Sequence, residues 1–338
     1  MKLTDLTIEQ QIRLLDQINA RTNQDQQTIE KDWWVTQVLK ALFSLPYAKE
    51  MSLKGGTSLS KAWGFIERFS EDIDIGIDRR FLGFTDELSK TQISDKLRRK
   101  ACTFVREKMQ FDLKEMLLQQ GISESNFDVK VNITPITTTD PEVILIDYQS
   151  VLPMSEYIEH TVKVEVSGRS MLEPINEVLL ESLLDKYLPD VPVAEPAFYA
   201  FVVDPKRTFL EKIMLLHEEF AKAQNDLRTE RMSRHLYDIY KMMLTTIATS
   251  AIEDEELYRS VVERRRKFIG MKDFDYNSLY SDRLSLKIPS TIINLWKIDY
   301  EKMCKTMIFG NAPLWDELIE SIQALNNKIK SMHYYHIK

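Results

Sequence analysis

The sequence predicts an α+β protein in which a mixed β-sheet flanked by helices is followed by an all-helical domain. Three patterns indicate this. Apolar and polar residues alternate strictly over 127–134, as they do on a half-buried strand. Apolar residues recur three and four apart over 88–120, as they do on an amphipathic helix. From about residue 204 the helical spacing continues nearly to the end of the chain.

A pair of helices opens the chain. We expect them over 7–20 and 25–45, where apolar residues such as Leu14 and Ile18 fall on one side of a helix. A short strand over 51–53 follows and leads toward a pair of glycines.

A turn of small residues connects this strand to the next one. Gly55 and Gly56 predict a tight turn, and Thr57 or Ser58 can cap the short helix after it. A second strand is then expected over about 71–78, where isoleucines alternate with polar residues.

The amphipathic pattern over 88–120 predicts one long helix that ends at Gly121. Three further strands are expected after it, over 127–134, 143–148 and 161–167. A helix pair, a mixed sheet and a long crossover helix together indicate an α+β domain.

Prolines mark the end of this domain. Proline is excluded from helix interiors and central strands. We therefore expect a connecting segment with at most one strand, over 198–203, and a domain of 1–203 followed by one of 204–338. Four of the 11 prolines cluster here: Pro189, Pro192, Pro196 and Pro205.

The composition is that of an ordinary soluble protein, with 43% hydrophobic and 29% charged residues. A length of 338 residues can supply two separate cores. Cys102 and Cys304 lie far apart, which argues against a disulfide framework. No apolar run approaches the roughly 18 residues of a spanning helix. We expect a cytoplasmic protein with no membrane partner.

The net charge of −7 argues against a broad nucleic-acid-binding surface. One basic cluster, 264–267, nevertheless stands out in the C-terminal part. It predicts either a solvated helix face or a local contact to RNA phosphates, for which a few Lys or Arg residues suffice.

The most informative residues are Asp72 and Asp74. On a strand both carboxylates point to one face, and the interleaved isoleucines point to the other. Adjacent anions repel, and a divalent cation relieves the repulsion. Oxygen ligands suit Mg²⁺ or Mn²⁺. Alternating acids also occur on ordinary exposed strands, but the glycine turn just upstream favours a metal that carries phosphates.

Glu165 is the candidate for a third carboxylate. In Val162-Lys-Val-Glu-Val166 the valines share one face, which leaves Glu165 on the other, with the same parity as the aspartates. If the two strands are neighbours, Glu165 completes a metal site; otherwise it forms a surface ion pair. Arg169, just beyond, can meet a triphosphate or pair with Glu173.

The glycine turn is the candidate phosphate site. The Walker A pattern is missing, so we expect backbone N–H groups and nearby side chains to hold the phosphates. Two metals can then stabilise the attacking and leaving oxygens of a phosphoryl transfer. The candidate nucleotide-binding residues are Lys54, Gly55, Gly56, Thr57, Ser58, Lys61, Arg68, Ser70 and Arg169.

These motifs resemble those of the AbiEii/AbiGii-type toxin nucleotidyltransferases, a branch of the DNA polymerase beta-like superfamily. The stretches 54–61 and 68–75 resemble motif I of that family. Four further stretches match its other motifs in order: Glu30-Lys-Asp-Trp-Trp-Val35, Val162-Lys-Val-Glu-Val166, Thr208-Phe-Leu-Glu-Lys-Ile213 and Arg234-His-Leu-Tyr-Asp238. The resemblance implies a nucleotidyltransferase-like sheet domain in which Asp72, Asp74 and Glu165 hold the metal.

The resemblance also adds two catalytic candidates beyond the proline segment. Lys212 corresponds to a conserved lysine of the family, and its ammonium group suits a β- or γ-phosphate. Asp238 corresponds to the acid of the terminal motif. It can orient Lys212, accept the proton of an attacking hydroxyl, or simply pair with Arg234 one helical turn away. The functional alternatives place the active site between the two domains.

The leading hypothesis is therefore a metal-dependent nucleotidyltransferase toxin that moves a nucleoside monophosphate from an NTP to an acceptor hydroxyl. The resemblance implies the tRNA 3′ end as acceptor, a cognate antitoxin from the same operon, and a role in abortive infection against phage.

Three alternatives remain open. The same fold can modify a protein side chain, or it can bind NTP as a regulator without turnover. A helical ribonuclease is the third, based on the spacing of Arg228 and His235.

Overall fold

The structure is a computed structural model that describes residues 1–85, 87–132, 142–153, 158–169 and 173–334. The chain divides into two compact units. The first contains residues 1–62 and 69–203, and the second contains residues 63–68 and 204–338. The division after residue 203 coincides with the end of a strand, and the short segment 63–68 belongs with the second unit.

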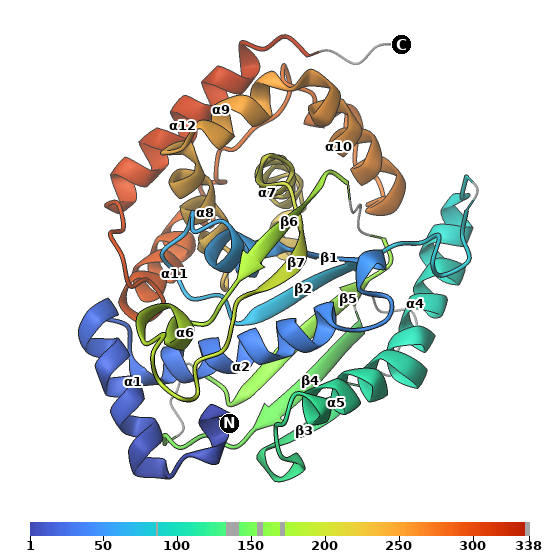
Figure 1. The fold of residues 1–338 in the computed structure, drawn as a ribbon. Coiled ribbons are helices and arrows are strands. Elements are labelled where there is room, and N and C mark those ends of the chain that lie inside the picture. Colours follow the sequence, from blue (N-terminus) through green and yellow to red (C-terminus); the bar gives the residue numbers. More distant parts are fainter. Residues whose placement is uncertain (86, 133–141, 154–157, 170–172, 335–338) are drawn as a thin grey trace. The chain divides into compact units, whose positions relative to one another are not determined.

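A seven-stranded mixed sheet forms the centre of the first unit (Figure 1). The strand order is β3-β4-β5-β2-β1-β7-β6. β2 pairs with β5 and β1 with β7 in parallel, whereas the other neighbours are antiparallel. The strands are β1 (Met51–Lys54), β2 (Asp72–Ile77), β3 (Phe127–Val131), β4 (Glu142–Tyr148), β5 (Thr161–Ser167), β6 (Ile175–Leu180) and β7 (Phe198–Val203).

Alternating burial along β2 and β5 shows why these segments form central strands. The isoleucines of β2 and the valines of β5 are fully buried, while the polar residues between them are half-buried. Burying one such apolar side chain contributes about 1.5–3 kcal/mol. The apolar face therefore fixes which side of the sheet the carboxylates of β2 and β5 occupy.

Helices cover this sheet. α1 (Ile8–Thr22) precedes α2 (Gln26–Phe43), which starts at the capping residue Asp25 and contacts both β5 and β7. α2 is buried on nearly all sides, including its two tryptophans, Trp33 and Trp34. Two short helices also belong here, α3 (Gly55–Thr57) and α6 (Leu183–Tyr187).

The predicted long helix is confirmed, with two departures from α-helical geometry. It consists of α4 (Arg98–Phe104) and α5 (Gln110–Gln119), joined and preceded by π-helical turns over Val105–Met109 and Gln92–Leu97. Gly121 ends it with a φ of +91°.

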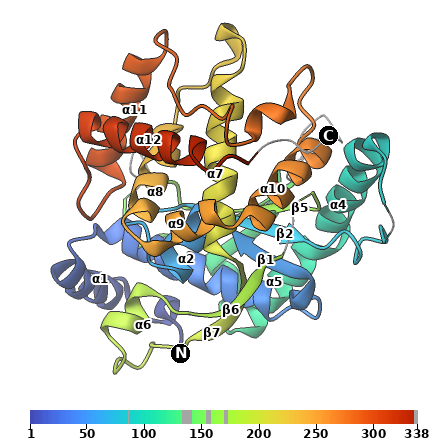
Figure 2. The same cartoon turned by 90° about the horizontal axis from the view of Figure 1, so that it is seen from above.

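Among the described residues of the second unit, the regular secondary structure is helical, apart from an isolated bridge between Arg68 and Ile308. α7 contacts α8, α9 and α10, and Figure 2 shows these three helices around it. Phe209, Ile213 and Leu216 of α7 are fully buried and form its apolar face. The helices are α7 (Pro205–Phe220), α8 (Ser233–Met243), α9 (Thr246–Glu253), α10 (Glu255–Phe268), α11 (Ile293–Thr306) and α12 (Trp315–Lys330).

The predicted helix pair and the strands expected over 51–53, 71–78, 143–148, 161–167 and 198–203 are confirmed. The strand expected over 127–134 ends at Val131, and its last two positions lie outside the described residues. β6 was not predicted. It lies at the edge of the sheet and most of its side chains are exposed, so it lacks the apolar face on which the prediction depends.

Within the described part of the chain, none of the helices combines the length and the apolarity that a membrane span requires.

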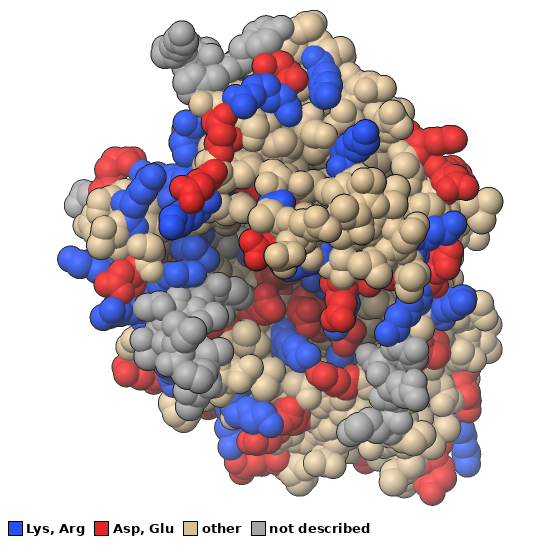
Figure 3. All heavy atoms as spheres, turned by 180° about the vertical axis from the view of Figure 1, so that it is seen from behind, with Lys and Arg blue, Asp and Glu red and all other residues tan. Residues whose placement is uncertain are grey.

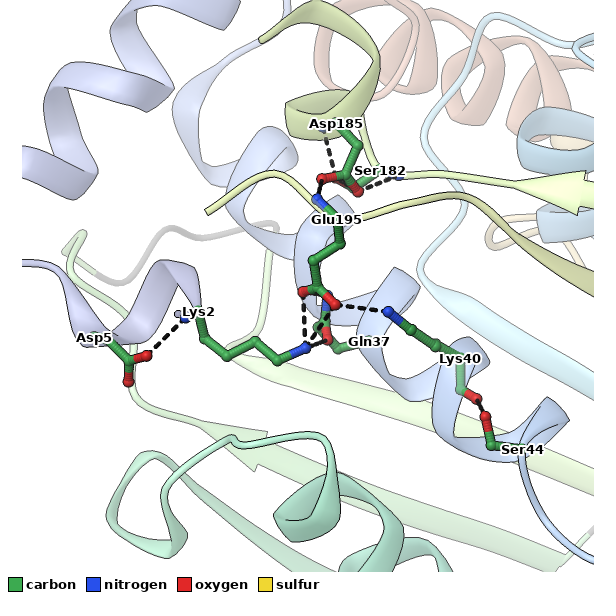
Figure 4. Close-up of polar contacts among 8 residues, drawn as sticks. All are labelled: Lys2, Asp5, Gln37, Lys40, Ser44, Ser182, Asp185 and Glu195. Atoms are coloured by element: carbon green, nitrogen blue, oxygen red, sulfur yellow. Dashed lines mark hydrogen bonds and ion pairs between the residues drawn. The ribbon is translucent and has the colours of Figure 1, made fainter. Parts of the chain in front are cut away.

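One carboxylate fastens the N-terminus to α2 (Figure 4). Glu195 accepts hydrogen bonds from Lys2 Nζ and Lys40 Nζ at 2.7 Å each and from Gln37 Nε2 at 2.9 Å. Its backbone N–H donates to Asp185 Oδ1 at 2.7 Å. Burial alone would raise the pKa of Glu195, but the hydrogen bonds from Lys2 and Lys40 outweigh it and lower the pKa.

Replacing Glu195 with alanine should lower the free energy of unfolding by about 2–3 kcal/mol, because the largely buried Lys2 ammonium loses its charge partner and keeps only the neutral acceptor Gln37 Oε1, at 2.9 Å. Urea titration followed by circular dichroism measures this. Glu177→Ala is the matched control: it is an exposed position on β6 and should change stability by less than about 0.5 kcal/mol. Equal midpoints for the two variants would contradict the assigned role of Glu195.

Candidate active site

Three charged residues form one row across three adjacent strands. Lys54 on β1 pairs with Asp74 on β2, and Asp74 pairs with Glu165 on β5. Residues that are partners across strands point to the same face of the sheet. Asp72 lies two residues before Asp74 and therefore shares that face. The structure thus brings Asp72, Asp74 and Glu165 together on neighbouring strands.

The carboxylates share a face without forming a closed set of metal ligands. Within the described residues, no group of three or more His, Cys, Asp or Glu side chains is arranged to hold a metal ion. The donor chemistry nevertheless suits a hard cation, since Mg²⁺ usually binds one or two carboxylates and takes its other ligands from water and substrate phosphates. Asp72 and Asp74 are half-buried, which leaves room for such ligands.

The glycine turn lies directly against Asp74. A Cβ atom on Gly55 would lie 1.9 Å from Asp74 Oδ2, closer than any real contact. Gly55 also has a φ of +72°, in the left-handed region that favours glycine. Two independent constraints therefore favour glycine here, and the absence of a Cβ atom leaves the space that the Asp74 carboxylate occupies.

The hydroxyls after the turn form internal hydrogen bonds, and the prediction that they cap a helix is wrong. Thr57 Oγ1 donates to the carbonyl oxygen of Asp72 at 2.5 Å and lies 3.1 Å from Ser70 Oγ. Ser58 Oγ donates to the carbonyl oxygen of Gly55 at 2.8 Å. Both side chains are buried. Neither residue caps a helix, because α3 continues without a break into a π-helical turn over Ser58–Ala62.

Lys61 is held by an ion pair on the far side of this turn. Its Nζ lies 2.6 Å from Asp32 Oδ1 and donates to the carbonyl oxygen of Glu181 at 3.0 Å. Asp32 also accepts a hydrogen bond from the backbone N–H of Leu183 at 2.7 Å. Asp32 on α2 therefore positions the helix that begins at the glycine turn.

Lys31 is a charged residue near the carboxylates to which sequence reasoning gave no role. It is 1% exposed, and its Nζ lies 3.1 Å from Glu71 Oε2. Burial lowers the pKa of Lys31, while the charges of Glu71 and Asp72 oppose this. Lys31 thus adds a positive charge near the start of β2. The detectable signal was three consecutive charged residues, Glu30 to Asp32, directly before the apolar run Trp33-Trp34-Val35.

Arg169 follows β5, where its backbone N–H donates to Ser167 Oγ at 3.2 Å. Gly56 and Lys54 are half-buried beside Gly55. The candidates of the first unit therefore lie at two places: the β1–α3 turn and the strands β2 and β5.

A second charged cluster lies within the second unit and joins Arg68, Lys212 and Asp238. Arg68 donates two hydrogen bonds to the Asp238 carboxylate, from Nε at 2.7 Å and from Nη2 at 2.8 Å. Lys212 Nζ lies 2.8 Å from Asp238 Oδ2. All three side chains are buried, and Asp238 is 0% exposed. A buried carboxylate thus pairs with two buried cations.

The charges in this cluster shift its pKa values. Burial would raise the pKa of Asp238, but the charges of Arg68 and Lys212 outweigh it and hold that pKa well below its ordinary value. Asp238 is therefore a weak proton acceptor, and the geometry favours its role in orienting Lys212. Burial, together with the charges of Lys212 and Arg234, lowers the pKa of His235 well below its ordinary value.

His235 and Arg228 bind different partners. His235 Nδ1 lies 3.5 Å from Lys212 Nζ, whereas Arg228 donates from Nε to Glu219 Oε2 at 2.8 Å. The contacts of these two residues give no support to the ribonuclease alternative, which depends on their acting together.

A mixed sheet with acidic residues together on one face is the arrangement expected of a nucleotidyltransferase, and comparison with known families shows that the chain is of this class. The profile of the family described as "Nucleotidyl transferase AbiEii toxin, Type IV TA system" matches residues 37–323. The chain belongs to this family and is a nucleotidyltransferase toxin of the type IV toxin–antitoxin class. The family implies an NTP substrate, an antitoxin partner and, in general, a divalent metal.

No curated protein matches the chain. Among solved structures, MenT4, a nucleotidyltransferase toxin from Mycobacterium tuberculosis H37Rv, is similar to it. The similarity covers 96% of this chain and 88% of MenT4, with 15% sequence identity and a TM-score of 0.48.

Gly55→Ala should reduce nucleotidyl transfer by at least about 100-fold, because the added methyl group displaces the Asp74 carboxylate and a shift of about 1 Å can cost that much. Gly83→Ala is the matched control. Gly83 has a φ of +89°, and a Cβ atom added to it would meet nothing within 4 Å, so it tests backbone strain without a clash. Similar activities of the two variants in an NTP-transfer assay would contradict the contact.

Asp238→Asn should lower the free energy of unfolding by about 3–5 kcal/mol, because it leaves Arg68 and Lys212 buried without their charge partner. The exposed position Asp226 provides the control Asp226→Asn, which should be nearly neutral. Denaturant titration measures both.

The pH dependence follows from the lowered pKa of Asp238. Its stabilising effect is fully present above the unfolded carboxyl pKa of about 4 and is lost as the pH falls toward the lower folded pKa. The stability difference between wild type and Asp238→Asn should therefore shrink below about pH 4. A difference that persists unchanged there would contradict the ion-pair assignment.

Proposed function

We propose that this toxin transfers a nucleoside monophosphate from an NTP to the 3′-terminal hydroxyl of tRNA, in the cytoplasm, as the toxic half of an abortive-infection system against phage. The row formed by Lys54, Asp74 and Glu165 beside Gly55 is the observation that supports this most directly. It combines metal-binding carboxylates, a cation and a sterically open turn on one side of a sheet. This combination suits phosphoryl transfer.

The carboxylates have the first role in this proposal. Asp72 and Asp74 would hold Mg²⁺ or Mn²⁺, with Glu165 as the third acid on the neighbouring strand. When bound, such a cation would neutralise the negative charge that develops on the phosphates during transfer. Lys31 and Lys163 lie near Asp72 and offset part of the negative charge that this face carries without a metal.

Backbone groups have the second role. The hydroxyls of Thr57 and Ser58 bond within the protein, so we assign phosphate binding mainly to the N–H groups of the Gly55-Gly56 turn, assisted by Lys54 and Arg169. Thr57 and Ser70 then act by fixing the start of β2. Lys61 acts by holding the helix after the turn against Asp32.

Lys212 is assigned to a terminal phosphate on the basis of its charge and the family motif that it matches, with Asp238 as its positioning partner. Arg68 shares Asp238 with Lys212 and fixes the carboxylate between them.

In the reaction, the acceptor oxygen forms a bond to the α-phosphorus while the bond from that phosphorus to the bridging oxygen breaks. Pyrophosphate then leaves. The proton of the acceptor hydroxyl passes to solvent, because Asp238, with its low pKa, is a weak proton acceptor.

The deciding experiment incubates the protein with each α-labelled NTP, Mg²⁺ and total RNA. We expect label in RNA of tRNA size, and a loss of at least about 100-fold in Asp72→Asn/Asp74→Asn because the metal loses its carboxylates. Asp226→Asn serves as the control for an exposed carboxylate.

Other outcomes discriminate among the alternatives. Label in protein instead of RNA would indicate a protein acceptor, and NTP binding without pyrophosphate release would indicate a regulator. Growth inhibition that survives in the double Asn variant would refute the enzymatic mechanism of toxicity.

A further inference from the structure

The segment 90–100 is the most basic part of the first unit. It contains five Lys or Arg residues against one Asp, a net charge of +4 in a chain whose total is −7. We refer to its three exposed members that lie on adjacent turns as the basic turn: Lys96, Arg99 and Lys100. The segment spans the π-helical turn Gln92–Leu97 and the start of α4.

The apolar side of this helix fixes the direction of the charges. Ile93, Leu97 and Ala101 are at most 2% exposed, whereas Lys96, Arg99 and Lys100 are exposed. In the space-filling view, Lys and Arg side chains gather at the edge of the molecule where this helix lies (Figure 3). The three basic side chains therefore point toward solvent, while the opposite, apolar side of the helix packs against the protein.

The same helix packs against the end of the carboxylate strand. Gly168 directly follows β5, and a Cβ atom placed on it would lie 3.4 Å from both Leu97 Cδ1 and Ala101 Cβ. Gly168 is three residues beyond Glu165, or roughly 10 Å along an extended chain. The basic turn is therefore attached to the strand that carries Glu165.

The cations of the basic turn are available to a ligand. Within the described residues, Lys96 and Lys100 form no ion pair, and Arg99 forms only an exposed pair with Asp95 at 2.7 Å. Such an exposed i,i+4 pair contributes only a few tenths of a kcal/mol. A phosphate can replace it at little cost.

The basic cluster 264–267 is different, although sequence analysis had singled it out for RNA phosphates. Arg265 forms a largely buried pair with Glu218 at 2.5 Å, and Arg266 donates to Asn277 Oδ1 at 2.9 Å. The guanidinium carbon of Arg264 lies 3.3 Å from the centre of the Phe268 ring. These contacts hold α10 in place, so this cluster offers fewer cations to RNA than the basic turn.

We propose that the basic turn binds backbone phosphates of the RNA acceptor close to the 3′ end that receives the nucleotide. The inference rests on the proposed function, because it names the surface that holds the acceptor of that reaction. Three exposed cations beside the end of β5 match a polyanion. Each phosphate contact adds about 0.7–0.9 to the slope of log K against log salt.

The test compares the wild type with Lys96→Gln/Arg99→Gln/Lys100→Gln, which removes three charges and keeps good helix formers. Lys287→Gln/Lys305→Gln/Lys330→Gln removes the same charge at dispersed exposed positions and is the matched control. Two readouts are measured: tRNA binding without NTP at several salt concentrations, and the KM values for tRNA and NTP in the transfer assay. Thermal unfolding checks that all variants fold.

We expect the basic-turn variant to bind tRNA at least 10-fold more weakly, with the salt slope reduced by about 2 and the KM for NTP unchanged. Equal tRNA binding by the two triple variants would overturn the proposal. So would a basic-turn variant that binds tRNA normally but loses neutralisation by its antitoxin. If the wild type binds tRNA but transfers nothing to it, the proposed function fails while the binding readout still decides the role of this surface.

Discussion

The contact between Gly55 and the Asp74 carboxylate is the constraint on which the rest of the site depends. It joins the turn after β1 to the middle of β2, and the parallel pairing of β2 with β5 extends the same row to Glu165. A side chain at residue 55 would push Asp74 away from the turn and out of this row. The phosphate-binding and metal-binding parts of the proposed site are therefore in direct contact. This contact is possible only because Gly55 has no side chain.

The two charged clusters differ in their electrostatics. The acids on β2 and β5 are only half-buried and share one face of the sheet, where like charges repel, and the proposed cation would relieve this repulsion. The second cluster is buried, and its charges pair with one another: Asp238 forms ion pairs with both Arg68 and Lys212. The first arrangement can exchange ligands during a reaction. The second is suited to holding a lysine in one fixed position, because breaking it would leave buried charges unpaired.

Local patterns predicted much of this fold, and non-local partners could not be predicted. Alternation in β2 and β5 is visible in a few residues, so the faces of Asp72, Asp74 and Glu165 followed from the sequence. The pairing of these two strands did not, because it depends on closing a loop of about 90 residues between them. The same limit applies to Arg68, which precedes β2 closely in sequence but binds Asp238 in the second unit. β6 was not predicted because it has no apolar face, and the alternating pattern of a half-buried strand is therefore missing from its sequence.

The hydroxyls of Thr57 and Ser58 show where residue type alone misleads. Ser and Thr beside a glycine turn predict helix caps and phosphate ligands, and here both oxygens bond to backbone carbonyls inside the protein. The reason is continuity: α3 passes into a π-helical turn, so there is no free helix start at residue 57 or 58 for a side chain to cap. By binding the Asp72 carbonyl, Thr57 ties the helix after the turn to the first residue of the carboxylate strand. Its hydroxyl thereby positions the proposed metal ligands rather than the phosphates, and the backbone of the turn remains as the source of donors.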